Sequence, residues 1–470
     1  MSFLPIFLWT DILIYMLLAV VAAGVFYVRK RPHLVTPWKS VLKRKRGMIS
    51  IMVLACYVLI GLSDSIHFRL ALESDGNGTE THYATEVISL FDLAAKPLRQ
   101  QVEKTYSAPF SHQLYVKEMQ KAEDGSLVYD YPRLKYGASH LENPSDKRDD
   151  ILQTMLDATL LSVVLVLLVY LAHSLLASWR NKSTVLTQAG RIIKGQSAYP
   201  LQTFYLMLFL LIMVTANLIA LSANYHVFGT DKVGQDVLYQ ALKSVRTGLV
   251  IGTVTTLVML PLAILLGIAA GYFRGWIDDL IQYIYTTLNS IPGVLLIAAA
   301  VLILQVYMNN NPDQFATIAE RADMRLLFLC IILGVTSWTG LCRILRAETL
   351  KLREAEYVLA SRALGASNFS ILHKHILPNL MHLVMIAVVL DFSGLVLAEA
   401  VLSYVGVGVD PSMISWGNMI NSARLEMARD PVVWWSLTAA FISMFILVLA
   451  ANLFADVVRD AFDPRMQGAR

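Results

Sequence analysis

Long apolar segments recur along the whole chain, separated by polar stretches. Each holds roughly 20 residues, the length that an α-helix needs to cross the hydrocarbon core of a bilayer. The pattern therefore predicts an all-α polytopic membrane protein with nine spans. The predicted spans cover residues 5–27, 48–62, 154–178, 204–222, 249–272, 281–306, 326–341, 380–404 and 433–454.

The composition agrees with this class. Of the 470 residues, 56% are hydrophobic and 16% are charged, whereas soluble domains carry about 25% charged residues. The three cysteines show neither the spacing of a metal site nor a disulfide framework. We therefore expect no metal and no cofactor. We also expect no nucleic-acid partner, because the net charge of +4 is small and the basic residues cluster in particular loops.

Those loops set the orientation. Residues 28–47, between the first two predicted spans, contain eight Lys and Arg residues. Because basic loops stay on the cytoplasmic side, the N-terminus is expected outside. Residues 179–200 carry four basic residues and no acids, so that loop is also expected inside. The C-terminus is then cytoplasmic.

The spans and loops divide the chain into four parts. Residues 1–62 form N-terminal spans with the basic loop, and residues 63–150 form a hydrophilic, tyrosine-rich extracytoplasmic insertion that is expected to be partly helical from 86 to 121. Residues 151–225 form an extra helical hairpin, and residues 226–470 form the core. The insertion either packs near residues 229–236 and 415–419 and helps to receive a protein partner outside, or it braces the extra spans; the sequence leaves both hypotheses open.

A charged stretch at residues 351–378 interrupts the apolar pattern of the core. It begins with good helix formers, breaks at Gly365 and runs on to Pro378, a residue type that ends or kinks a helix. The pattern predicts a helix–glycine–helix elbow on the cytoplasmic side, which a soluble partner could grip. An ordinary amphipathic surface loop is the simpler alternative.

This stretch resembles the cytoplasmic coupling loop, or EAA loop, of permease subunits in ABC importers that depend on a solute-binding protein. The family pattern has Glu-Ala-Ala, three residues, Gly, and a Pro thirteen positions later. Here Leu359-Ala360-Ser361 precede Gly365 with that spacing, and Leu359 replaces the glutamate. The residues of this stretch most resemble those of the oligopeptide, dipeptide and nickel branch of the family. The resemblance implies ATPase-coupling roles for Glu356, Ala360, Ser361, Gly365, Ala366 and Pro378.

Two further matches lie on the outer side of the core. Residues 226–236 resemble the family's Gly-Thr-Asp element, with Gln235 where the family has Arg, and residues 415–419 (SWGNM) resemble an outer loop. A plain helix-start signal accounts equally well for single residues of the first element. The resemblance implies a surface beneath a docked binding protein, formed by Gly229, Thr230, Asp231, Gly234, Asp236, Ser415, Trp416 and Gly417.

The resemblance also implies a fold, a location and partners. The fold is the transmembrane domain of a type I ABC importer, with extra N-terminal spans and the insertion, in the bacterial cytoplasmic membrane and surrounded by lipid. The protein partners are a second permease that is a different chain, ATP-binding subunits and a solute-binding protein. The chain itself is expected to be non-catalytic, because its segment 190–197 has Gln196 where a phosphate-binding loop needs Lys.

Ionisable and helix-breaking residues inside spans mark candidate pathway positions. Asp391 and Glu399 lie eight residues apart, on the same half of one predicted helix, and Pro292 interrupts another span. An ion-coupled secondary transporter that uses Asp391 and Glu399 is the main alternative, and an intramembrane enzyme or scaffold is a third. The elbow favours the importer, because an ion-coupled carrier needs no dock for an ATPase.

Overall fold

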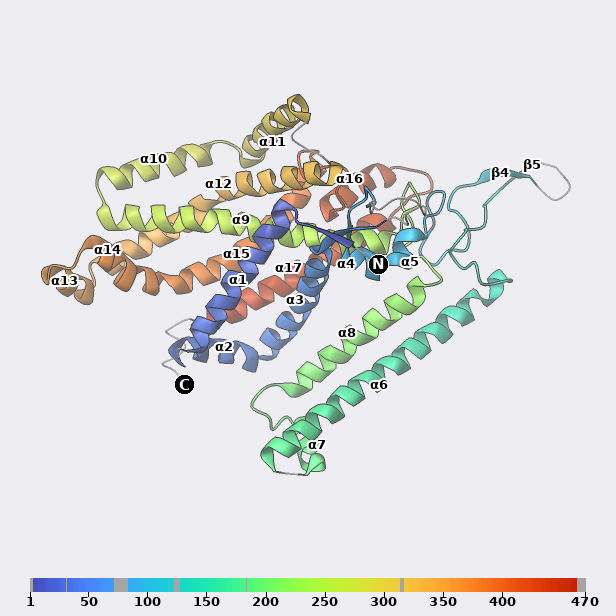
Figure 1. The fold of residues 1–470 in the computed structure, drawn as a ribbon, viewed down its shortest axis with the longest axis horizontal. Coiled ribbons are helices and arrows are strands. Elements are labelled where there is room, and N and C mark those ends of the chain that lie inside the picture. The colour runs from blue at the N-terminus through green and yellow to red at the C-terminus, as the bar shows by residue number, and fades with distance from the viewer. Residues whose placement is uncertain are drawn as a thin grey trace, which may run out of the picture. The chain divides into compact units, whose positions relative to one another are not determined.

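The structure is a computed structural model, drawn in Figure 1. It describes residues 3–30, 32–71, 83–121, 127–182, 184–312 and 317–462. Residues 463–470, the end of the predicted core part, lie outside these ranges. The chain divides into two compact units, which are described separately below.

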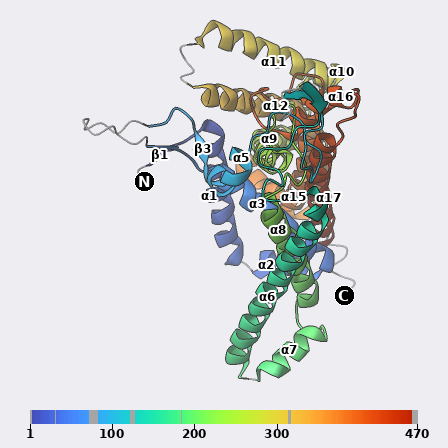
Figure 2. The same cartoon turned by 90° about the vertical axis from the view of Figure 1, so that its right-hand side faces the viewer.

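The first unit consists of Met1–Pro5, Thr36–Arg246 and Ile414–Val457. Helices α6 and α8 lie side by side as an antiparallel hairpin, with α7 between them in the chain (Figures 1 and 2). Helix α8 also packs against α3. Outside the insertion, the helices with residues in this unit are α2 (Pro32–Lys43), α3 (Lys45–Asp64), α6 (Lys147–Asn181), α7 (Val185–Ile193), α8 (Leu201–Ser222), the start of α9 (Val237–Phe273), α16 (Trp416–Glu426) and most of α17 (Trp435–Phe462).

The predicted insertion is mostly loop, with short helices and strands. Its strands β2 and β3 pair antiparallel, with His67 opposite Ser89, and β4 and β5 form a hairpin. The expectation of helix from 86 to 121 is correct only for two short helices, because β4 and extended loop occupy the rest. The elements of the insertion are β2 (His67–Leu70), β3 (Ile88–Ser89), α4 (Leu90–Ala94), α5 (Lys96–Gln100), β4 (Glu118–Lys121), β5 (Leu127–Asp130) and η1 (Pro144–Asp146). Strand β1 (Phe3–Ile6) lies outside the insertion and pairs with β2.

The second unit consists of Ile6–Val35, Thr247–Met413 and Val458–Arg470. Its interior is formed by aliphatic and aromatic side chains of α9, α12 and α15 in two clusters, one of which includes residues of the elbow. Its elements are α1 (Trp9–Arg29), the remainder of α9, α10 (Trp276–Ser290), α11 (Gly293–Asn310), α12 (Ile318–Arg353), α13 (Glu356–Ala363), α14 (Asn368–Ile371), η3 (Leu372–Ile376) and α15 (Leu377–Tyr404).

Small residues let α9 approach α12 closely. A Cβ atom at Gly267 would lie 2.9 Å from the carbonyl oxygen of Cys342, and one at Gly271 would lie 2.6 Å from Cβ of Thr349. Glycine at such positions allows membrane helices to pack backbone against backbone, where van der Waals contact rather than hydrophobic burial holds helices together. The two helices therefore form a close-packed support for the elbow that follows α12.

The nine predicted spans are confirmed in number, since nine helices in the described part of the chain are long and apolar enough to cross a membrane. The sixth differs in extent. The break at residues 290–293 separates α10 from α11, and only α11 meets the criteria for a span. Pro292 lacks an N–H group and precedes the first residue of α11, where such a donor is not needed.

Candidate functional site

The elbow at residues 351–378 is built as the sequence predicts, and Gly365 is its turning point. Its φ is +82°, a left-handed conformation that glycine adopts without strain. The Gly365 amide donates to the Arg362 carbonyl at 3.0 Å, and the Ala366 amide donates to the Ser361 carbonyl at 3.1 Å. This pair of bonds is a Schellman motif, which ends α13 and turns the chain sharply.

Pro378 distorts its helix rather than ending it. The chain is helical from Asn368 to Tyr404, and Pro378 lies in the first turn of α15. The five residues before α15, Leu372–Ile376, form a π-helical segment. Proline provides no N–H and its ring crowds the preceding turn, so a wider π turn accommodates it.

One side of the elbow is anchored in the second unit, and the other is exposed. Val358, Ile371 and Ile376 are at most 1% exposed and belong to the unit's larger hydrophobic cluster. Leu364 and Phe369, on either side of Gly365, are 87% and 79% exposed. Of the six predicted coupling residues, Ser361 and Ala366 are half-buried and the rest are exposed: Glu356, Ala360, Gly365 and Pro378.

An ion pair and a hydrogen bond from arginines of α12 hold the helix that leads into the elbow, and the sequence did not predict either contact. Arg346 of α12 donates two hydrogen bonds to Asp278 of α10, at 2.6 and 2.7 Å. These bonds to Arg346 hold the pKa of Asp278 below its usual range. The Arg353 guanidinium donates to the Tyr272 carbonyl at 2.7 Å. The acidic pair after the turn at Gly275 was a usable signal, but its partner on α12 lies 68 residues away.

The outer-side residues are covered in the first unit by the insertion. Thr230 Oγ1 accepts from the Ser107 amide at 2.7 Å and donates to the Thr105 carbonyl at 2.8 Å. A Cβ at Gly229 would lie 2.3 Å from the Ser107 carbonyl oxygen, and one at Gly234 would lie 1.8 Å from that of Glu103. The two glycines thus allow a backbone approach that any side chain would prevent.

A buried network of charged side chains joins the insertion to residues 226–236. We call it the His226 network, and it consists of Glu103, His226 and Asp236. His226 Nδ1 lies 2.8 Å from an Asp236 oxygen, and Nε2 lies 3.5 Å from a Glu103 oxygen. Burial alone would lower the pKa of His226, but the hydrogen bond to Asp236 and the proximity of Glu103 raise it to about 9. His226 is therefore protonated at neutral pH, and its positive charge lies between the carboxylates of Glu103 and Asp236.

Glu103 is held by more than the imidazole. Its carboxylate accepts from the backbone amides of Lys135, Tyr136 and Gly137 at 2.7–3.1 Å. Burial alone would raise the pKa of Glu103, but His226 and the three amides together lower it to about 2. The carboxylate therefore organises two loops of the insertion around the histidine.

Residues 415–417 of the predicted outer loop also make contacts within the first unit. Ser415 accepts from the Asn418 amide at 3.0 Å and caps α16, while the Trp416 indole donates to the Ala241 carbonyl at 3.0 Å. Of the eight predicted docking residues, only Asp231 keeps a partly exposed surface, and the other seven are buried. Their docking role stays a prediction, and their side chains have little surface to offer another protein.

The candidate pathway residues lie in different surroundings in the second unit. Glu399 is 2% exposed and accepts from Ser403 Oγ at 2.8 Å. Asp391, eight residues earlier on α15, is half-buried, whereas Pro292 is exposed at the break between α10 and α11. Their place in a pathway stays a prediction.

Nine candidate spans in the described part of the chain, together with a helix–glycine–helix elbow, are features of one class of protein, the permease subunits of ATP-driven importers. Residues 263–468 match the family described as "Binding-protein-dependent transport system inner membrane component". The chain belongs to this family, in its peptide branch, and is a multi-pass protein of the inner membrane. The predicted class, fold and location are confirmed.

Three relatives carry the assignment to the branch. The chain is 32% identical over 247 residues to the glutathione transport system permease protein GsiD of Pectobacterium atrosepticum, covering 52% of this chain and 74% of that protein. It is 31% identical to the dipeptide permease DppC of Bacillus subtilis, with coverage of 52% and 69%. It is 31% identical to the oligopeptide permease OppC of Mycobacterium tuberculosis, with coverage of 52% and 78%.

Proposed function

We propose that this permease forms half of a pathway for peptides or similar small solutes, together with a second, different permease chain. The proposal is supported by relatives named for glutathione, dipeptide and oligopeptide transport. A solute-binding protein delivers the solute outside, and separate subunits hydrolyse ATP inside, so this chain performs no catalysis. The family assignment does not favour the ion-coupled alternative based on Asp391 and Glu399.

The exposed apolar tip of the elbow is the observation that carries the coupling role. Leu364 and Phe369 are the most exposed large apolar side chains of the elbow, and exposed apolar groups of this kind mark protein interfaces. The buried side chains Val358 and Ile371 hold the loop to the second unit's core. A force on the tip would therefore reach α12 and α15 through packed side chains.

Gly365→Val tests this coupling role. The space around the glycine is open, so the variant's cost is backbone strain of about 1–2 kcal/mol at positive φ. We expect normal insertion into the membrane, with loss of substrate-stimulated ATP hydrolysis and uptake in reconstituted complexes. Gly195→Val is the matched control, since Gly195 has a φ of +68°, meets only the side chain of Gln202 and lies outside the elbow.

Leu364→Ser with Phe369→Ser tests the same contact without backbone strain. The double variant should retain less ATPase subunit on purification, because it removes the exposed apolar area while leaving the Schellman turn intact. Normal coupled uptake in Gly365→Val, together with normal ATPase retention in the serine variant, would refute the proposed dock.

For the binding protein, we propose that the insertion supplies part of the receiving surface. Its β4–β5 hairpin exposes Met119, Leu127 and Tyr129, with 74%, 70% and 63% of their surfaces accessible. Replacing residues 118–130 by a short Gly-Ser turn would leave the His226 network in place. We expect uptake to require a higher concentration of binding protein, and unchanged concentration dependence would favour the bracing role instead.

A further inference from the structure

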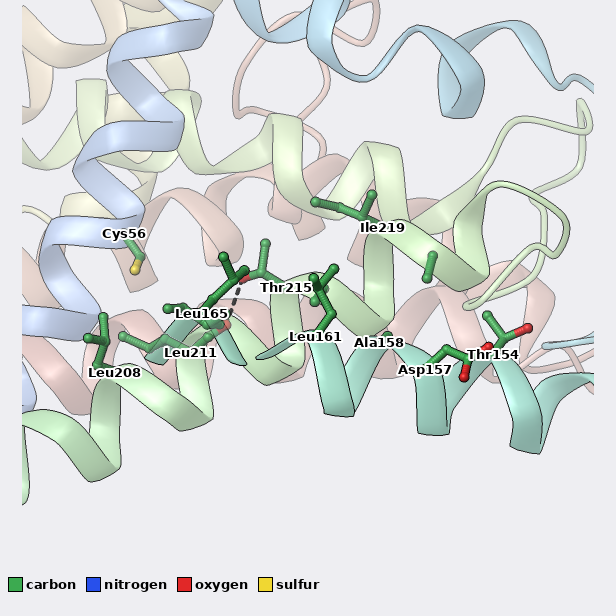
Figure 3. A pocket seen from close by; sticks show the side chains of 13 residues that line it. Cys56, Thr154, Asp157, Ala158, Leu161, Leu165, Leu208, Leu211, Thr215 and Ile219 are labelled. Atoms are coloured by element: carbon green, nitrogen blue, oxygen red, sulfur yellow. Dashed lines mark hydrogen bonds between the residues drawn. The ribbon is translucent and has the colours of Figure 1, made fainter. Parts of the chain in front are cut away.

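A cavity lies between α3, α6 and α8 in the first unit (Figure 3). Its volume is about 740 Å³, within the range of about 300–1,000 Å³ that is typical of small-molecule sites. Most of its lining is aliphatic, from both helices of the extra hairpin, and Cys56 of α3 contributes from the facing side. The cavity thus belongs to the part of the chain that the core fold does not require.

The cavity runs along α6 from Asp157 into a long stretch that contains no Asp, Glu, Lys or Arg. In α6, residues 158–177 contain no Asp, Glu, Lys or Arg, and at about 1.5 Å per residue this stretch is roughly as long as a bilayer core is thick. In the predicted topology Asp157 lies in the first turn of the span that starts at residue 154, at its outer end. Figure 3 shows Asp157 and Thr154 at one end of the cavity, with Leu208 and Leu165 towards the other.

Polarity changes along the cavity in the same direction. Thr215, about halfway along, donates its hydroxyl to the Leu211 carbonyl at 2.8 Å and offers no free donor. The Asp157 side chain is exposed, and no hydrogen bond or ion pair joins it to another residue in the described ranges. The site is an apolar slot with one negative charge at its mouth.

We propose that the cavity binds one acyl chain of an outer-leaflet phospholipid whose head group carries a primary ammonium, paired with Asp157. A carboxylate at the boundary attracts a cation and repels an anionic head group. A primary ammonium also donates three hydrogen bonds, which a quaternary ammonium lacks. A transmembrane helix of a partner does not fit, because a cylinder about 10 Å wide would exhaust this volume within about six residues.

The test uses the full-length chain in nanodiscs that contain equal amounts of phosphatidylethanolamine, phosphatidylcholine and phosphatidylglycerol. Native mass spectrometry after transfer to detergent counts the retained lipids. We expect about fivefold preference for phosphatidylethanolamine in the wild type, the upper range for one partly exposed ion pair. Asp157→Asn should lose the preference, whereas Asp149→Asn, an exposed acid on the same helix outside the cavity, should keep it.

Two further readouts separate a built site from surrounding bilayer lipid. Ala216→Trp fills the slot and should abolish retention of all three lipids. Alkylation of Cys56 by a small apolar maleimide should be slower with phosphatidylethanolamine than with phosphatidylcholine, and this difference should vanish in Asp157→Asn. Equal retention of the three lipids by the wild type, unchanged retention by Ala216→Trp, or Cys56 alkylation independent of head group would each overturn the proposal.

Discussion

Deprotonation of His226 should loosen the attachment of the insertion to the outer loop of the first unit. The imidazole is 1% exposed and lies between Glu103 and Asp236, so its positive charge offsets two buried carboxylates. Once neutral, the ring keeps one donor for two acceptors, and the carboxylates repel each other. The perturbation is a rise in pH, with His226→Gln as its genetic counterpart.

The magnitude follows from the pKa of His226. Its pKa is about 9 in the folded protein against an ordinary 6.5, a difference that corresponds to about 3 kcal/mol. Because the folded pKa is the higher one, this stabilisation is complete below pH 6.5 and is lost as pH rises to 9. Glu103, with its pKa lowered to about 2, loses its contribution only in strong acid and does not interfere.

Amide hydrogen exchange measures this loosening at the groups that bond Glu103. The amides of Lys135, Tyr136 and Gly137 should lose protection on the order of a hundredfold between pH 6.5 and about 9.5, after correction for the intrinsic exchange rate. His226→Gln should show low protection at both pH values. His140→Gln, an exposed histidine beside Asp150, should behave as wild type. Equal corrected protection at both pH values in the wild type would refute the reasoning.

Two further predictions concern the same face and the orientation of the chain. Gly234→Ala should make the insertion sensitive to limited proteolysis, because the added Cβ would lie 1.8 Å from the Glu103 carbonyl oxygen and the backbone is at a φ of +75°; wild-type resistance would contradict this contact. Tyr129→Cys should react with an impermeant thiol reagent in spheroplasts, and Lys374→Cys should not; the reverse labelling pattern would overturn the topology.

Periodic and local signals made much of the fold predictable. Long apolar runs predicted the nine candidate spans of the described residues, because a helix in a bilayer must satisfy its own backbone hydrogen bonds and be largely apolar. Gly365 marked the elbow correctly, since a left-handed turn at the end of a helix favours that residue. Pro378 could either end or kink its helix. The structure shows that the helix continues, with a π-helical segment at Leu372–Ile376 before the proline.

Contacts between distant segments could not be predicted in the same way. Arg346 and Asp278 are 68 residues apart, and Thr230 and Ser107 are 123 apart. Neither contact leaves a periodic pattern in the sequence, because an ion pair or a single hydrogen bond needs only one residue from each segment. The strands of the insertion were missed for a related reason, since β4 alternates too briefly to stand out from loop.

The outer element shows how one motif can serve a different contact. The Gly-Thr-Asp element was expected to lie beneath a docked protein, with the insertion packed near it, and in the structure Gly229 and Thr230 contact the backbone of that insertion directly. Trp435 extends this seat, because its indole donates to the Thr230 carbonyl at 2.9 Å and its ring packs against Tyr115 at 4.8 Å. A partner that approaches this face of the first unit would meet the insertion before the motif. Recognition outside should then depend on exposed residues of the insertion such as Tyr129, whereas changes in the buried motif should act through the insertion's stability.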